Sequence, residues 1–191
     1  MNLLWNWLSD PANWEGAYGI PTRVVEHLAY SAVTLVLAAL VGIPLGLWIG
    51  HTGRGRVAVV NLVNGMRSVP TLGLLFVAVL AVGPLLAGDI AFLVPSIFVL
   101  VVLAIPPILA GAYAGVEGVD PGARDAARGM GMRSGEALLK VEVPCALPLI
   151  FSGLRSAALQ VVATATLAAS VSLGGLGRFL IDGQAYRDYG Q

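Results

Sequence analysis

Charged side chains are scarce in this sequence. Asp, Glu, Lys and Arg make up 12% of the 191 residues, whereas soluble globular chains carry about 25%. Acidic and basic residues balance to a formal net charge of +0. The basic residues are scattered and are not interleaved with aromatics, so we expect no nucleic-acid partner. This shortage of charge favours a protein that lies mostly in a lipid membrane.

Residues that usually carry chemistry are also few. The single cysteine, Cys145, excludes an intrachain disulfide, and we expect it to be a small buried side chain at a helix start. His27 and His51 are the only histidines and lie far apart in the sequence. The motifs H-E-x-x-H, G-x-S-x-G and G-x-x-x-x-G-K-[ST] are missing from the sequence. We therefore predict no catalytic residue, no metal site and no cofactor in this chain, and we reject an intramembrane enzyme.

Long apolar runs stand in place of charge. They cover residues 27–50, 57–83, 91–115 and 149–173, and each is long enough for a helix that crosses a hydrocarbon core of ~30 Å. The predicted fold class is therefore an all-α integral membrane protein with four transmembrane helices in the domain 27–191. In the preceding segment, 1–26, Trp5, Trp7 and Trp14 suit an amphipathic stretch at the headgroup level of the membrane.

Small and polar residues punctuate these runs. Gly42, Gly46 and Gly50 recur at every fourth position, so one helix face permits the close approach of another helix. Pro70 should kink or break the second run. Polar residues around this break are predicted to line a translocation path, although hydrogen bonds between helices explain them nearly as well: Asn61, Asn64, Arg67, Ser68 and Thr71.

Two arginines, Arg67 and Arg155, lie within apolar runs, where a charge is costly in lipid. We expect both to have a structural role, near a helix end or paired with an acid such as Glu117 or Glu142. Aromatic residues suited to caging an ammonium group are also present in the runs, but their spacing forms no recognisable box: Tyr30, Trp48, Phe76, Phe92 and Phe98.

The segment Glu117–Pro148, called the polar loop below, separates the third and fourth runs. Asp120 and Pro121 predict a helix start, because an N-cap acceptor is followed by proline. Gly131 suits a left-handed helix end. Ser134 is expected to cap a second helix that leads into the fourth run.

The first helix of the polar loop has a small apolar face. It consists of Ala123, Ala126, Ala127 and Met130. Such a face suits a shallow groove on a partner protein.

A longer pattern runs through the same loop. It reads Asp125-Ala126-Ala127, three residues, Gly131, nine residues, then Val141-x-Val143-Pro144. These spacings resemble the cytoplasmic EAA loop of ABC-importer membrane subunits, with Asp in place of Glu and Val in place of Ile and Leu. The resemblance implies that a partner ATPase docks here. The implied docking residues are Asp125, Ala126, Ala127, Met130, Gly131, Val141, Val143 and Pro144.

Three flanking stretches narrow the resemblance. RSVPTLGLL from Arg67, PPILAGAYAGVEGVDPGARDAARGMGM from Pro106 and SLGGLGRFLIDG from Ser172 resemble permeases of importers for glycine betaine, choline and other osmoprotectants. The resemblance implies three partners: an ABC ATPase that binds ATP and Mg, a second permease subunit in a homo- or heterodimer, and an extracytoplasmic substrate-binding protein. Permeases of this kind are expected to continue through at least one further C-terminal helix, whereas this sequence contains only four runs.

The basic residues predict an orientation. Arg54 and Arg56 follow the first run, and four more basic residues lie in the polar loop, so six of the eleven share one side. The positive-inside rule makes this side cytoplasmic. We place the N-terminus outside, in a multi-pass protein of the bacterial plasma membrane.

Two other transport functions stay open. A permease of the same fold for another solute, such as methionine or an oxyanion, would have a similar loop. An ATP-independent transporter subunit would need no glycine-punctuated loop and would carry internal repeats, which we do not find in the runs.

Overall fold

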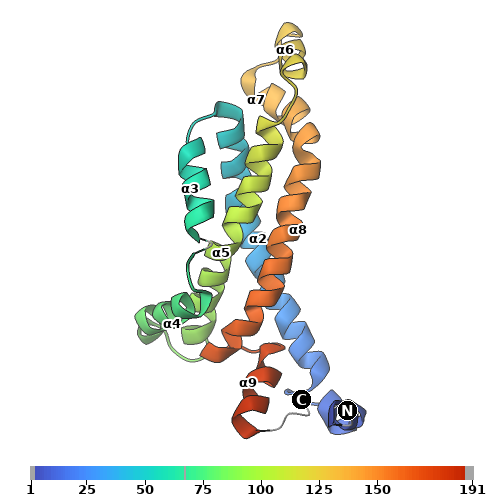
Figure 1. The fold of residues 1–191 in the computed structure, drawn as a ribbon, viewed down its shortest axis with the longest axis vertical. Coiled ribbons are helices and arrows are strands. Elements are labelled where there is room, and N and C mark those ends of the chain that lie inside the picture. Colours follow the sequence, from blue (N-terminus) through green and yellow to red (C-terminus); the bar gives the residue numbers. More distant parts are fainter. Residues whose placement is uncertain (1–2, 67, 188–191) are drawn as a thin grey trace. The chain divides into compact units, whose positions relative to one another are not determined.

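The computed structural model describes residues 3–66 and 68–187 of the chain, and these residues are helical, without a strand. The helices are α1 (Leu3–Ser9), α2 (Ile20–Thr52), α3 (Arg56–Met66), α4 (Thr71–Val82), α5 (Ile90–Glu117), α6 (Pro121–Gly129), α7 (Ser134–Ala137), α8 (Val143–Ala168) and α9 (Gly177–Tyr186) (Figure 1). Short 3-10 turns follow α1, α4 and α8, and a π-helical turn, Leu138–Glu142, joins α7 to α8. The all-helical class is as predicted.

The chain divides into two compact units, described separately here. Unit 1 contains residues 1–34, 70–100 and 160–191, and unit 2 contains residues 35–69 and 101–159. Helices α2, α5 and α8 each contribute to both units.

In unit 2, α2 packs against α5 through glycines. A Cβ atom added at Gly46 would lie 2.6 Å from the Cβ of Ala112 and 2.7 Å from the carbonyl oxygen of Leu109. Gly42 faces Ile108 and Gly50 faces Tyr113 and Val116 in the same way, so contacts advance along both helices and the helices are parallel. The predicted close-approach face is confirmed, because side chains at these positions would hold the two backbones apart.

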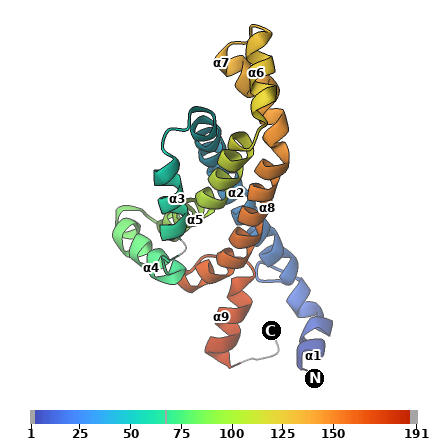
Figure 2. The same cartoon turned by 45° about the horizontal axis from the view of Figure 1, so that its top comes forward.

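The pair α5 and α8 in unit 2 is antiparallel and equally close. Gly111 faces Gly153, whereas Gly115, further along α5, faces Ala146, earlier on α8. A buried cluster of Ala112, Val116, Ala146 and Ile150 fills the contact beside these glycines. Figure 2 shows α5 and α8 side by side in this region. The ends of α2 and α5 and the beginning of α8 therefore come together.

The second apolar run is not one continuous helix. Helix α3 ends at Met66, and α4 begins at Thr71 after Pro70, which stands at its N-cap. The predicted break is confirmed. With 11 and 12 residues, each helix is only about 16–18 Å long at 1.5 Å per residue, too short to cross a membrane alone.

The described residues include three helices that are long and apolar enough to span a membrane: Ile20–Thr52, Ile90–Glu117 and the continuous helical stretch Ser134–Val171. Four transmembrane helices were predicted, and three of them are confirmed as single helices of sufficient length. Large side chains such as Leu40 and Phe151 are exposed on α2 and α8, as expected for surfaces that face lipid.

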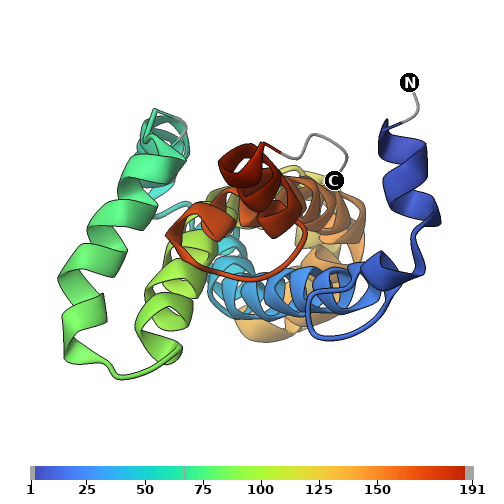
Figure 3. The same cartoon turned by 90° about the horizontal axis from the view of Figure 1, so that it is seen from below.

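Unit 1 gathers the beginnings of α2 and α5, the end of α8, and helices α1, α4 and α9 (Figure 3). Helix α2 begins at Ile20 and so takes in the last part of the predicted N-terminal segment. The Trp7 ring meets the Phe179 ring of α9 edge-on, with centroids 5.3 Å apart, whereas Trp5 is exposed. The imidazole Nε2 of His27, a buried side chain, lies 3.0 Å from the carbonyl oxygen of Val162.

Candidate functional site

The polar loop begins with the predicted helix. The Asp120 carboxylate accepts a hydrogen bond from the Ala123 N–H at 3.2 Å, and Pro121 is the first residue of α6. Gly131 adopts φ +81°, and the Met132 N–H closes the helix end on the carbonyl oxygen of Ala127 at 3.1 Å. A left-handed glycine at this place is the usual way to satisfy the last carbonyls of a helix.

The second loop helix differs from the prediction at its cap. Arg133, and not Ser134, is the N-cap of α7, and the Glu136 carboxylate accepts a hydrogen bond from the Arg133 N–H at 3.0 Å. Ser134 has another contact, since its hydroxyl oxygen lies 2.6 Å from Nε2 of His51. The prediction that Ser134 caps this helix is therefore wrong, because the Ser134 hydroxyl contacts a histidine that is distant in the sequence.

A buried carboxylate, Glu142, links four elements at this end of unit 2. It is 4% exposed. Its Oε2 lies 2.6 Å from Nδ1 of His51 at the end of α2, and its Oε1 lies 3.1 Å from Nε of Arg124 on α6. Since a carboxylate can only accept, His51 donates its Nδ1–H, and Nε2 faces Ser134 on α7.

Arg124 also donates to the carbonyl oxygen of Val116 near the end of α5. Buried charges of this kind are tolerated when they are paired and hydrogen-bonded. The loop helices are therefore joined to the ends of α2 and α5 and to the start of α8 by one polar network. Sequence reasoning missed this network; its only signal was an acid, Glu142, placed inside an otherwise apolar Val-x-Val-Pro stretch.

The predicted apolar face of α6 divides between two environments. Ala127 is buried in the unit, whereas Ala126 is exposed and Met130 is 69% exposed. Asp125 is also exposed and pairs with Arg128 at 3.4 Å. A partner protein can thus reach Asp125, Ala126 and Met130, but Ala127 serves the packing of the loop itself.

The remaining motif residues lie at the junction with α8. Val141 belongs to the π-helical turn, and Val143 and Pro144 open α8. Val141 and Val143 are half-buried, while Pro144 is exposed. Cys145 is also exposed, so the prediction of a buried thiol is wrong.

The structure gives less support to the predicted translocation path. Asn61 is exposed on α3, the Ser68 hydroxyl donates to the carbonyl oxygen of Gly65 at 2.9 Å, and Thr71 is the half-buried first residue of α4. Arg67 and the side chain of Asn64 fall outside the described residues. The path remains a prediction.

The acids suggested as partners for Arg155 are engaged by other groups. Glu117 pairs with Arg56 at 3.1 Å, and Glu142 is held by His51 and Arg124. Arg155 itself is exposed on α8. Within residues 3–66 and 68–187, no group of three His, Cys, Asp or Glu side chains is placed to hold a metal ion.

Comparison with known proteins decides the family. The sequence profile of the family described as "Binding-protein-dependent transport system inner membrane component" matches residues 42–191. The chain belongs to this family. The predicted ABC-importer permease is thus confirmed as a family assignment.

Members of this family with curated names are similar over most of the chain. The glycine betaine/carnitine/choline transport system permease protein OpuCB of Bacillus subtilis is 34% identical over 160 residues, which cover 83% of this chain and 70% of that protein. The carnitine transport permease protein OpuCB of Listeria monocytogenes is 32% identical over 171 residues, covering 88% of this chain and 74% of that protein.

A solved structure of the same kind supports the fold. A chain of the methionine ABC transporter MetNI, in an inward-facing conformation, superposes with a TM-score of 0.73 at 25% identity. The match covers 93% of this chain and 82% of that chain.

Proposed function

We propose that this chain is the membrane-spanning permease subunit of an ABC importer for quaternary-ammonium osmoprotectants such as glycine betaine or choline. The observation that carries the proposal is that two relatives are named for glycine betaine, carnitine and choline, which all contain a trimethylammonium group. The ATP and Mg that drive such an importer would be bound by a partner subunit, because the chain lacks the phosphate-binding motif.

The polar loop is the proposed site for that ATPase. Its helix α6 presents exposed Asp125, Ala126 and Met130, a small surface of the kind that a groove on a partner accepts. The Glu142 network joins α6 to the spanning helices. Movement of the docked helix would therefore be passed on to the helices and not absorbed by the loop.

The helix directions in unit 2 support the proposal of four membrane crossings. Helices α2 and α5 are parallel there, and Gly50 near the end of α2 contacts Val116 near the end of α5. A chain that reaches one side twice in this way has to cross back in between. We infer that α3 and α4 make this crossing in series. The positive-inside rule then puts the polar loop in the cytoplasm and the N-terminus outside.

The complete transporter would pair this subunit with a second permease and receive solute from an extracytoplasmic binding protein. A permease for methionine is the second candidate function, because the solved structure that resembles this chain comes from a methionine transporter. Uptake assays with both solute classes separate the two.

Gly131 gives a direct test of docking. A Val at this position would oppose φ +81°, since a left-handed conformation costs about 1–2 kcal/mol for a residue with a Cβ. We expect Gly131→Val to abolish ATP-dependent uptake of choline or glycine betaine by the complete transporter in proteoliposomes, together with ATPase binding.

Gly129→Ala is the matched control. Gly129 ends α6 with open space around the place of a Cβ and without a positive φ, so uptake should be retained. If the Gly131→Val transporter kept both full uptake and its ATPase, the docking role of the polar loop would be refuted.

A further inference from the structure

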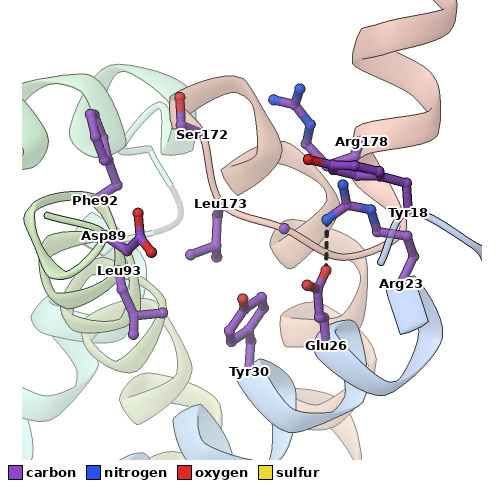
Figure 4. A pocket seen from close by; sticks show the side chains of 11 residues that line it. Tyr18, Arg23, Glu26, Tyr30, Asp89, Phe92, Leu93, Ser172, Leu173 and Arg178 are labelled. Atoms are coloured by element: carbon purple, nitrogen blue, oxygen red, sulfur yellow. Dashed lines mark hydrogen bonds and ion pairs between the residues drawn. The ribbon is translucent and has the colours of Figure 1, made fainter. Parts of the chain in front are cut away.

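Unit 1 contains a pocket of about 570 Å³, within the range of small-molecule sites. Four parts of the chain line it: Tyr18 before α2, the beginning of α2, the beginning of α5, and the segment from Ser172 to Arg178 (Figure 4). In the proposed orientation these are the parts of the helices that lie on the extracytoplasmic side.

One wall of the pocket is fixed by Glu26. Its Oε2 accepts hydrogen bonds from Nη1 of Arg23 at 2.8 Å and from the Gly175 N–H at 2.9 Å. A Cβ at Gly174 would overlap the Glu26 carboxylate, so a side chain at this position would require Glu26 to shift. The Tyr18 ring covers the guanidinium of Arg23, with 5.3 Å between Cζ and the ring centroid.

The charges around the pocket do not cancel. Arg23 is neutralised by Glu26, and Arg178 forms two hydrogen bonds to Asp182, at 3.2 and 2.6 Å. Asp89 has no ion-pair partner among residues 3–66 and 68–187. Because Arg178 is paired with Asp182, which lies outside the pocket lining, the exposed Asp89 carboxylate is left in excess, and this excess favours a cationic ligand.

Aromatic and aliphatic side chains line the pocket together with Asp89. Tyr30 on α2 and Phe92 on α5 contribute aromatic rings, and Leu93 and Leu173 contribute aliphatic surface. Aromatic faces attract cations through their quadrupole, and quaternary ammonium groups are the ligands for which proteins use this attraction most. The spacing of Tyr30 and Phe92 in the sequence gave no sign of a box, because they belong to different helices.

We propose that this pocket binds a quaternary ammonium group, with Asp89 as its counter-charge and Tyr30 and Phe92 as its aromatic walls. The proposal rests on the proposed function and adds a selectivity to it. Both pocket arginines are already engaged by acids, so the carboxylate of glycine betaine finds no free cation and is repelled by Asp89. The pocket prefers choline, a simple cation, to glycine betaine, a zwitterion.

Binding of labelled choline to the permease–ATPase complex tests the site directly. The complex is placed, without its binding protein, in nanodiscs of phosphatidylethanolamine and phosphatidylglycerol. We expect saturable binding that tetramethylammonium displaces at least tenfold more effectively than glycine betaine. Asp89→Asn should weaken binding at least tenfold, and Phe92→Leu several-fold.

Two control variants distinguish a specific loss of choline binding from misfolding of the protein. Glu15→Gln removes an exposed carboxylate of unit 1 that does not line the pocket, and it should bind choline within twofold of the wild type. Asp89→Glu keeps the charge and should restore most of the binding lost in Asp89→Asn. Choline binding that is absent, or that is unchanged by Asp89→Asn, overturns the proposal.

Failure of the site and failure of the proposed function have different signatures. In one case the complete transporter shows ATP-dependent osmoprotectant uptake, but Asp89→Asn changes neither uptake nor choline binding. This result refutes the proposed site and supports the proposed function. In the other case choline binding depends on Asp89, but the transporter takes up no osmoprotectant. This result supports the proposed site and refutes the proposed function.

The same ammonium group also occurs on a lipid headgroup. Nanodiscs that contain phosphatidylcholine distinguish this source. Displacement of labelled choline by the lipid assigns the pocket to a headgroup, whereas unchanged choline binding assigns it to a free solute. Either result is consistent with recognition of a quaternary ammonium by Asp89.

Discussion

Glu142 is a charged side chain held almost entirely away from solvent, 4% exposed, between Arg124 and His51. Removing one member of a buried ion pair leaves the other member uncompensated and costs about 3 kcal/mol. We therefore infer that this carboxylate stabilises the structure by connecting two loop helices to the end of α2.

We expect Glu142→Ala to lower the melting temperature of the purified permease by roughly 6–12 °C, from a loss of about 3 kcal/mol. Glu142→Gln should have a smaller effect, because an amide oxygen still accepts a hydrogen bond. Lys140→Ala is the control, since Lys140 and Glu136 form a solvent-exposed pair, whose loss should leave the melting temperature almost unchanged. Equal melting temperatures for Glu142→Ala and the wild type would contradict the role of the network.

Elements of the polar loop could largely be predicted from local sequence. The start of α6 at Asp120 and Pro121 and its end at Gly131 follow from hydrogen bonding within a few residues, and both are confirmed. The same kind of reasoning placed the break at Pro70.

What sequence alone did not predict depends on contacts between distant residues. His51 is 91 positions from Glu142 and 83 positions from Ser134, and its contact with the Ser134 hydroxyl replaces the cap predicted for α7. The pocket at Asp89 needs Tyr30 from α2 and Ser172 from the segment after α8. The periodicity of residues within one helix does not predict contacts between different helices, so these features could be found only in the three-dimensional structure.

At the level of helix pairs, Gly46 and Gly65 offer a matched comparison. A Cβ at Gly46 would press on Ala112 and Leu109 of α5, whereas a Cβ at Gly65 on α3 meets nothing within 4 Å. Alanine favours a helix over glycine by about 1 kcal/mol, but overpacking costs about 1–3 kcal/mol.

We therefore expect Gly46→Ala to lower the melting temperature of the permease and Gly65→Ala to leave it unchanged or raise it. Differential scanning fluorimetry of the two purified variants measures this. A Gly46→Ala protein as stable as the Gly65→Ala protein would mean that α2 and α5 are not in close contact.

For the whole molecule, orientation in the membrane is the property to test. In a Cys145→Ser background, Ala17→Cys marks the segment before α2 and Arg128→Cys marks the polar loop, and both positions are exposed. We expect a membrane-impermeant maleimide to label Ala17→Cys in intact spheroplasts and Arg128→Cys only after permeabilisation. The reverse labelling would invert the proposed topology and place the polar loop out of reach of a cytoplasmic ATPase.

The glycine contacts of unit 2 also restrict where a solute can travel. Between α2 and α5, and again between α5 and α8, backbone atoms approach so closely that there is no room even for a methyl group at Gly46 or Gly111. A trimethylammonium compound is many times larger than a methyl group and cannot pass along either seam without prising the helices apart. The proposed conduit therefore runs over an outer face of this unit, where the proposed second permease subunit would supply the facing wall.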